Sequence, residues 1–324
     1  MLTAVPSCKE DDDDYEYSDF MSGEMTVGEV STYLAPGTTL TLTPSGLTDP
    51  TEVGYYWYNT WNSQKDTTLY EGGTGDGTYT IIIPQETGEY TITGVAYATG
   101  YYTSSVKVTF TVIDNSLEGS LKGTEIAKSS TIFTDPRDGN QYFTSAEGPT
   151  LWMKQNLYWA GSGISYEKSE VMDKIFGRYY TWEEAKDACP EGWRLPTDED
   201  FKTLLSSVAD AESLTLHETF KNAGSSMMVN ATFLDERLWT YWPEINLDNS
   251  SRFCGLPVGY AIQIGTACRY TGFETYASFW TADECGEGSD TAFYRYLYVR
   301  SNDLYIGQGD KSSFRASVRC VRDR

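Results

Sequence analysis

The sequence predicts an all-β sandwich followed by an α+β domain. The chain has 324 residues, which is enough for two domains. Aromatic residues make up 15% of the chain, and tyrosine and threonine are abundant, which favours strands over helices. The first third shows short alternating apolar runs, whereas clear helix start signals occur in the second half, at Thr181 and Thr197.

The composition excludes several classes of partner and site. The formal net charge is -23 and the pI is about 4.3, so nucleic acid and anionic membrane surfaces are repelled. No apolar run approaches the length of a membrane-spanning helix. Six cysteines with a single histidine argue against a zinc site and for disulfides outside the cytoplasm. We therefore expect no cofactor and no nucleic-acid partner.

The first residues predict a lipid anchor. Met1 to Cys8 read as the end of a signal peptide that stops at a lipoprotein cysteine. The acidic run Lys9 to Asp14 resembles the export signal of Bacteroidetes surface lipoproteins. We expect lipidation at Cys8, an acidic tether up to residue 23 and a surface-exposed position on the outer membrane, with the lipid as the only membrane contact. The alternative is a solvated acidic linker with a free cysteine.

Residues 24–114 predict the β-sandwich. Alternation such as Val106, Val108, Phe110 and Val112 indicates half-buried strands. Trp57 fits the buried tryptophan of an immunoglobulin-like third strand, and Gly88-Glu89-Tyr90 resembles the tyrosine corner of the sixth strand. The segment has no cysteine, so it resembles bacterial immunoglobulin-like or PKD-like spacers. Its predicted role is to hold the next domain away from the cell surface.

Residues 115–130 have the composition of a linker, and residues 131–324 predict the α+β domain. A hairpin is expected around Asp138-Gly139, followed by a strand with Trp152. Capping boxes at Thr181/Glu184 and Thr197/Asp200 predict two helices. The predicted helices are 181–189, 198–208 and a weaker one at 214–222. The predicted strands are 258–264, 278–282, 293–299, 304–306 and one at Val318.

The cysteines predict one or two disulfides. Cys189 ends a predicted helix, and its best candidate partner is Cys320 at the far end of the chain. Among the three cysteines that remain, the favoured pair is Cys268 with Cys285, across a hairpin whose second strand contains Trp280. Cys254 with Cys268 is nearly as good, and the spacing leaves the choice open.

Five motifs in order carry a family resemblance. They are Phe133-Thr134-Asp135-Pro136-Arg137-Asp138-Gly139-Asn140-Gln141-Tyr142, Leu151-Trp152-Met153-Lys154-Gln155-Asn156-Leu157, the block Tyr180 to Thr197, Phe279-Trp280-Thr281 and Ser317-Val318-Arg319-Cys320-Val321. Together they resemble the Fibrobacter succinogenes major paralogous domain, over roughly the last 200 residues. That family is similar to the C-type-lectin-like fold and, more remotely, to formylglycine-generating enzymes. The resemblance implies a C-type-lectin-like domain, and it implies no common activity.

Catalytic and metal chemistry find little support in the sequence. His217 lies in a plain helical context, and without a second histidine it is the only possible imidazole base. The spare thiol is a possible nucleophile, but the cysteine pair and copper site of formylglycine-generating enzymes are not matched. The acidic loop 283–290 could hold a structural calcium ion, although the Glu-Pro-Asn and Trp-Asn-Asp signatures of calcium-dependent lectins are absent. We expect no catalytic residue and no metal site.

The aromatic stretch Trp239-Thr240-Tyr241-Trp242 is the candidate ligand-binding site. On a strand, Trp239 and Tyr241 would share one side and Trp242 the other, so at least one ring could be exposed. Core packing is the competing interpretation. Four other tryptophans coincide with the family motifs and are assigned to the core: Trp152, Trp182, Trp193 and Trp280.

These observations predict a cell-surface lipoprotein that is not an enzyme. Its terminal domain is expected to bind an extracellular glycan or protein and to serve in adhesion. One alternative is a structural component of the cell envelope, such as a fimbria-like subunit. The other is an enzyme of the formylglycine-generating type, which a solvent-exposed, redox-active cysteine would favour.

Overall fold

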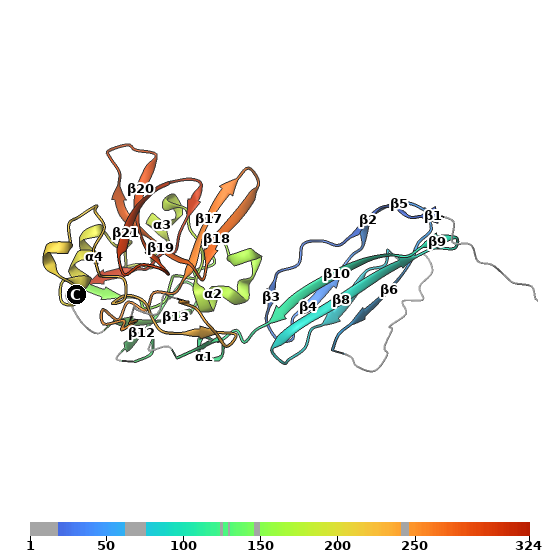
Figure 1. The fold of residues 1–324 in the computed structure, drawn as a ribbon, viewed down its shortest axis with the longest axis horizontal. Coiled ribbons are helices and arrows are strands. Elements are labelled where there is room, and N and C mark those ends of the chain that lie inside the picture. The colour runs from blue at the N-terminus through green and yellow to red at the C-terminus, as the bar shows by residue number, and fades with distance from the viewer. Residues whose placement is uncertain (1–18, 62–75, 124–125, 129, 146–149, 241–245) are drawn as a thin grey trace, which may run out of the picture. The chain divides into compact units, whose positions relative to one another are not determined.

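The computed structural model describes residues 19–61, 76–123, 126–128, 130–145, 150–240 and 246–324 (Figure 1). The described chain is predominantly β. It divides into a first unit, Met1–Thr32 with Pro36–Val112, and a second unit, Tyr33–Ala35 with Ile113–Arg324. Among the described helices, none is long and apolar enough to span a membrane.

The first unit consists of strands. In chain order these are β1 (Asp19–Phe20), β2 (Ser22–Thr26), β4 (Thr39–Leu42), β5 (Ser45–Asp49), β6 (Gly54–Asn59), β7 (Tyr79–Ile82), β8 (Gly88–Tyr97), β9 (Tyr101–Tyr102) and β10 (Ser104–Val112). Strand β8 lies between β10 and β6 and is antiparallel to both. Strand β4 pairs with β7, β2 with β5, and β1 with β9.

Trp57 organises the core of the first unit. Its side chain is fully buried and stacks on Tyr79, with ring centroids 5.5 Å apart. The indole Nε1 donates a hydrogen bond to the backbone oxygen of Gly77 at 2.9 Å, which satisfies the polar atom. Tyr90 donates its hydroxyl hydrogen bond to the backbone oxygen of Glu86, four residues upstream. The predicted burial of Trp57 is therefore confirmed.

The second unit mixes strands and short helices. Apart from the short strand β3 (Tyr33–Leu34), its elements are α1 (Leu117–Ser120), β11 (Leu121–Lys122), β12 (Ser130–Thr134), β13 (Gln141–Ser145), β14 (Thr150–Trp152), η1 (Tyr166–Lys168), α2 (Glu170–Phe176), α3 (Trp182–Ala188), α4 (Asp198–Leu205), η2 (Ala211–Ser213), β15 (Thr232–Phe233), β16 (Glu236–Arg237), β17 (Val258–Ile264), β18 (Ala267–Phe273), β19 (Tyr276–Glu284), β20 (Thr291–Tyr298), β21 (Leu304–Asp310), β22 (Phe314–Arg315) and β23 (Val321–Asp323).

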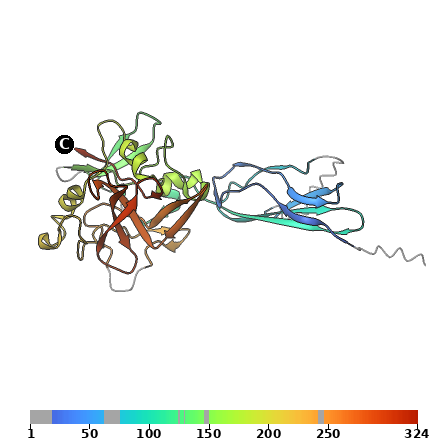
Figure 2. The same cartoon turned by 90° about the horizontal axis from the view of Figure 1, so that it is seen from above.

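Its main sheet has the strand order β18-β17-β19-β20-β21, and β22 also pairs with β17. In Figure 2 the green and yellow helices lie around the orange and red strands of this sheet. The last strand, β23, pairs with β14, so that Trp152 lies opposite Val321. The strand expected at Val318 therefore starts three residues later. Ser317 instead makes a single bridge to Phe279 of β19.

Both predicted capping boxes are present. Glu184 accepts a hydrogen bond from the backbone N–H of Thr181 at 2.8 Å, and Asp200 accepts one from that of Thr197 at 2.7 Å. The helices α3 and α4 begin where these boxes predict.

The helix expected at 214–222 is absent, and this prediction was wrong. The segment contains turns, and His217 has a positive φ of 58°. One backbone hydrogen bond stays within the segment, from the N–H of Glu218 to the carbonyl of Thr215, and Phe220 exchanges two with Leu304. Other backbone groups bond to side chains. Asp198 accepts from the N–H of His217, and Arg295 donates to the carbonyl of Glu218. These tertiary bonds replace the intrahelical ones.

Helix α2 was not predicted, and it buries a charged residue. Burial raises the pKa of Asp173 to about 6, although Arg178 and Ser165 donate to its Oδ2. Its Oδ1 is buried and has no hydrogen-bond partner. The free-energy cost of removing the carboxylate from water therefore exceeds what its hydrogen bonds and ion pair recover.

We expect the unfolding free energy to reflect this Asp173 carboxyl. Because the folded pKa lies above the unfolded value, the folded state takes up the proton first as pH falls. The contribution of this proton uptake to the unfolding free energy is complete below the unfolded pKa of the carboxyl, and it is lost as pH rises through about 6. From pH 7 to pH 5 the wild type should gain about 1.3 kcal/mol more than Asp173→Asn. Urea unfolding of both proteins at the two pH values measures this, and equal gains would contradict it.

Candidate functional site

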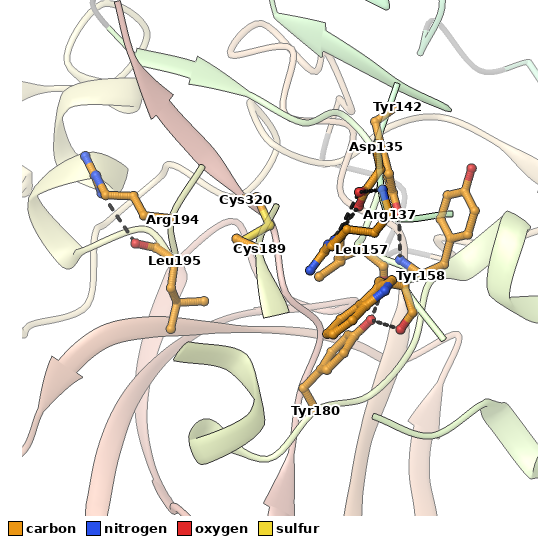
Figure 3. The surroundings of a disulfide bond; sticks show 11 residues. Asp135, Arg137, Tyr142, Leu157, Tyr158, Tyr180, Cys189, Arg194, Leu195 and Cys320 are labelled. Carbon is orange, nitrogen blue, oxygen red and sulfur yellow. Dashed lines mark hydrogen bonds and ion pairs between the residues drawn. A yellow bond between two sulfur atoms is a disulfide. The ribbon is translucent and has the colours of Figure 1, made fainter. Parts of the chain in front are cut away.

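One predicted disulfide is present. Cys189, at the end of α3, is bonded to Cys320, with an S–S distance of 2.05 Å. Figure 3 shows the bond between Arg194 and Leu195 on one side and the Asp135–Arg137 pair on the other. Asp135 is completely buried and accepts from the Arg137 guanidinium at 2.7 Å, which orders the hairpin turn.

The predicted pair Cys268–Cys285 is not formed. Both cysteines and Cys254 are free thiols. The sequence placed Cys268 in a hairpin with the strand of Trp280, but Cys268 lies on β18, whose hairpin partner is β17. Strand β17 lies between β18 and β19 in the sheet. The strand of Cys268 is therefore not paired with the strand of Trp280, as the prediction required.

Two of the free thiols lie in buried or half-buried surroundings. Cys254 is completely buried, and Asn249 donates to its sulfur. Burial raises the pKa of the half-buried Cys268 thiol, which reduces the thiolate fraction at neutral pH.

The first residue of the candidate aromatic site, Trp239, lies in the core. Trp239 is completely buried, and its indole Nε1 donates to the backbone oxygen of Gly255 at 3.0 Å. It packs in the core with Phe279 and Leu297, so its assignment as a ligand-binding residue was wrong. Tyr241 and Trp242 lie outside the described residues, as does Cys8. The residues that flank this stretch, Arg237 and Leu247, line a cavity of about 460 Å³.

The four tryptophans assigned to the core are buried. Trp280 is fully enclosed and donates to the backbone oxygen of Tyr180 at 2.8 Å. Trp182 donates to the backbone oxygen of Thr281 at the same distance. Trp152 and Trp193 are also buried. These side chains therefore serve the scaffold.

The other sequence candidates have structural partners. The His217 ring stacks on Phe293 with centroids 4.6 Å apart. In the acidic loop, Glu284 pairs with Lys311 at 2.9 Å, and Asp283 accepts from the N–H of Asp198 at 2.6 Å. Within the described part of the chain, no three histidine, cysteine or acidic side chains form a group that could hold a metal ion.

The main sheet carries a group of half-buried tyrosines, which we call the tyrosine face. Its members are Tyr260, Tyr276, Tyr294, Tyr296, Tyr298 and Tyr305. Along β20 the three tyrosines alternate with Arg295 and Leu297, which are completely buried. Because side chains of a strand alternate between the two faces, the three tyrosines share the face opposite Arg295 and Leu297, and on this face Tyr294 also packs against Phe314 and Trp280.

Cross-strand pairing brings these rings into contact. Tyr276 of β19 lies opposite Tyr298 of β20, and their rings stack with centroids 4.9 Å apart. Tyr296 lies opposite Tyr305 of β21 and stacks on it at 5.1 Å. Tyr276 also approaches Tyr296 to 6.2 Å and Tyr260 of β17 to 6.3 Å. The rings therefore form one continuous cluster across four strands.

Two glycines give the rings room. Gly307 lies opposite Tyr294 on β21, and a Cβ at Gly307 would fall 2.3 Å from Cζ of that ring. A Cβ at Gly272 would fall 2.5 Å from the ring of Tyr276. Such close approach of a ring to the backbone requires glycine at both positions.

Most phenol hydroxyls of the face have no hydrogen-bond partner within the described chain. Tyr305 shares a hydrogen bond of 2.8 Å with Ser301. Within the described chain, the hydroxyls of the other five have no hydrogen-bond partner. Burial raises the pKa of Tyr294 to about 12 and also raises the pKa values of Tyr276 and Tyr296. These three phenols therefore keep their protons at physiological pH and remain hydrogen-bond donors.

This face was not predicted from the sequence, although a signal for it exists. The strand 293–299 was predicted without an assignment of its side chains to the two faces. Tyr294, Tyr296 and Tyr298 recur with the period of two of a strand. The contributions of Tyr260, Tyr276 and Tyr305 depend on strand order and register, which the sequence does not give.

The second unit contains the region that is similar to a known family. Residues 146–322, more than half of the chain, match the model of the Fibrobacter succinogenes major domain. The chain belongs to this family.

The comparison with solved structures gives a much weaker likeness. The chain is similar to the structure of the Yersinia pseudotuberculosis adhesin InvE, with 10% sequence identity and a TM-score of 0.26. The match covers 92% of this chain and 70% of that one. No argument rests on so low a score. No curated protein matches the chain significantly.

Proposed function

We propose that this protein is a surface-exposed lipoprotein of the outer membrane whose terminal domain is a non-catalytic binding and adhesion module for a glycan or a protein. The observation that carries the proposal is the tyrosine face. Half-buried tyrosines offer rigid contact area and a polar tip at little conformational cost, which suits a recognition surface. Five hydroxyls without a partner in the described chain are available to a ligand.

The domain assignments belong to the same proposal. A C-type-lectin-like second unit is supported by the link from α3 to the last strand through Cys189–Cys320, and by the pairing of β14 with β23. An immunoglobulin-like spacer is supported by the buried Trp57 and by the Tyr90 hydroxyl, which bonds upstream in the manner of a tyrosine corner. The lipid anchor at Cys8 rests on the sequence.

Cell adhesion tests the proposal. Cells that display the full chain are allowed to settle on immobilised mucin, on a mixed glycan panel and on extracellular matrix proteins. We expect retention on at least one surface, and a loss of most of it in the double variant Tyr296→Ala/Tyr305→Ala, because both rings of a stacked pair are removed. The matched control is Tyr58→Ala, which removes an exposed tyrosine (42%) from β6 of the first unit. Equal retention of all three proteins would contradict a role for the tyrosine face.

A further inference from the structure

The charge of the tyrosine face differs from that of the chain as a whole. The chain has a formal net charge of -23, whereas the face consists of phenol side chains, and burial raises the pKa values of Tyr276, Tyr294 and Tyr296 above the ordinary value. Long-range repulsion from the chain disfavours a polyanionic ligand. The face positions on β20 and β21 (Tyr294, Tyr296, Tyr298, Tyr305 and Gly307) supply no carboxylate for a cationic one. An uncharged ligand is the electrostatic match.

The tyrosine face combines apolar ring surface with polar hydroxyl groups. Stacked pairs expose apolar ring surface, and each ring ends in a hydroxyl that can donate and accept. A pyranose ring has the same combination, with apolar C–H faces and a rim of hydroxyls. Apolar side chains of a protein partner would cover the rings but leave the half-buried hydroxyls without partners, which is unfavourable.

We propose that the tyrosine face binds a neutral glycan chain, by stacking of sugar C–H faces on the rings and hydrogen bonds from sugar hydroxyls to the phenols. This inference rests on the proposed binding function and names its ligand class. Tyr296 is the central ring, because it contacts Tyr276, Tyr294 and Tyr305. The ring of Tyr294 lies over Gly307, and only a residue without a side chain leaves room for the ring in this position.

The test uses the full chain on an array of neutral oligosaccharides (cello-, chito-, manno- and galacto-oligosaccharides) and anionic ones (polygalacturonate, heparan sulfate fragments and sialylated glycans). The best neutral oligosaccharide is then titrated calorimetrically. We expect neutral glycans to bind and anionic glycans to bind more weakly. Tyr296→Phe should weaken binding roughly fivefold by losing a hydroxyl, and Tyr296→Ala at least about tenfold by losing the ring as well.

Two further variants separate ligand contact from stability. Gly307→Ala keeps every tyrosine but displaces the Tyr294 ring, since the added Cβ would lie 2.3 Å from it, so it should also weaken binding. Tyr58→Ala in the first unit should leave the affinity unchanged. Thermal unfolding of each variant checks that the second unit remains folded under the binding conditions.

The outcomes distinguish this inference from the proposed function. Preference for anionic glycans, or neutral-glycan binding that Tyr296→Ala leaves intact, overturns the inference. If no glycan binds but retention on a matrix protein depends on Tyr296, the glycan inference fails and the binding function stands. If neither glycan nor protein binding depends on the face, both fail.

Discussion

Replacing Asp198 by asparagine is expected to destabilise the second unit by about 3–5 kcal/mol, the usual effect of removing one partner of a buried ion pair. Asp198 and Arg295 are 1% and 0% exposed, and the guanidinium donates to both carboxylate oxygens, at 2.5 and 2.7 Å. Burial lowers the pKa of Arg295, and the hydrogen bonds and charge of Asp198 oppose that shift. The variant leaves the guanidinium buried without its hydrogen-bonded anion.

The pair also fixes a segment without regular structure. Asp198 accepts from the backbone N–H of His217, and Arg295 donates to the carbonyl of Glu218 while its guanidinium lies 3.5 Å over the ring of Phe220. Loss of the carboxylate therefore releases the 214–222 segment as well. We expect hydrogen exchange to accelerate there first, because two of its backbone hydrogen bonds, at His217 and Glu218, are made to the pair.

Urea unfolding at neutral pH measures the loss. The double variant Asp198→Asn/Arg295→Met should recover part of it, because the uncompensated cation is gone. The matched control is Glu183→Gln, which breaks an exposed pair with Lys186 and should change the unfolding free energy by at most about 0.5 kcal/mol. A loss below about 1 kcal/mol in Asp198→Asn, or no recovery in the double variant, would contradict the argument.

Local signals in the sequence predicted the elements that depend on local physics. The capping boxes at Thr181 and Thr197 satisfy backbone donors within one turn, so they specify α3 and α4 regardless of context. The strand alternation near Val106 and the burial of Trp57 likewise follow from side-chain period and size. The bond between Cys189 and Cys320 was predicted because the expected location outside the cytoplasm favours disulfides, and Cys320, at the far end of the chain, was the best candidate partner for the cysteine at the end of α3.

Features that depend on tertiary contacts were not predictable in this way. The segment 214–222 has helical composition, yet Asp198 and Arg295 take its backbone groups. Trp239 was a ligand-binding candidate because at least one ring of the aromatic stretch 239–242 could be exposed, with core packing as the competing interpretation. The structure buries it, and Gly255 provides the acceptor for its indole. The tyrosine face requires β17, β19, β20 and β21 to be neighbours, and only the folded register brings them together.

The disulfide gives the second large effect. Cys320→Ser is expected to unfold the second unit on mild heating and to leave the first unit unchanged. The bond closes a loop of 131 residues, which on the chain-entropy model contributes about 5 kcal/mol. That is an upper value, yet it is comparable to the whole stability of a typical domain, about 5–15 kcal/mol. The first unit contains no cysteine among residues 24–114 and does not depend on the bond.

The position of the bond explains why its loss should spread through the second unit. Cys320 lies next to Val321, whose backbone exchanges hydrogen bonds with Arg194, and its own carbonyl accepts from Met153 at 3.0 Å. Releasing it frees β23 from β14 and from the segment after α3. Calorimetry should show two transitions in the wild type and a downward shift of one in Cys320→Ser. Cys189→Ser should match it, and Cys285→Ser, at a free thiol, should not. A single unchanged transition in Cys320→Ser would refute the prediction, because a linked loop of this length cannot be released without enlarging the unfolded ensemble.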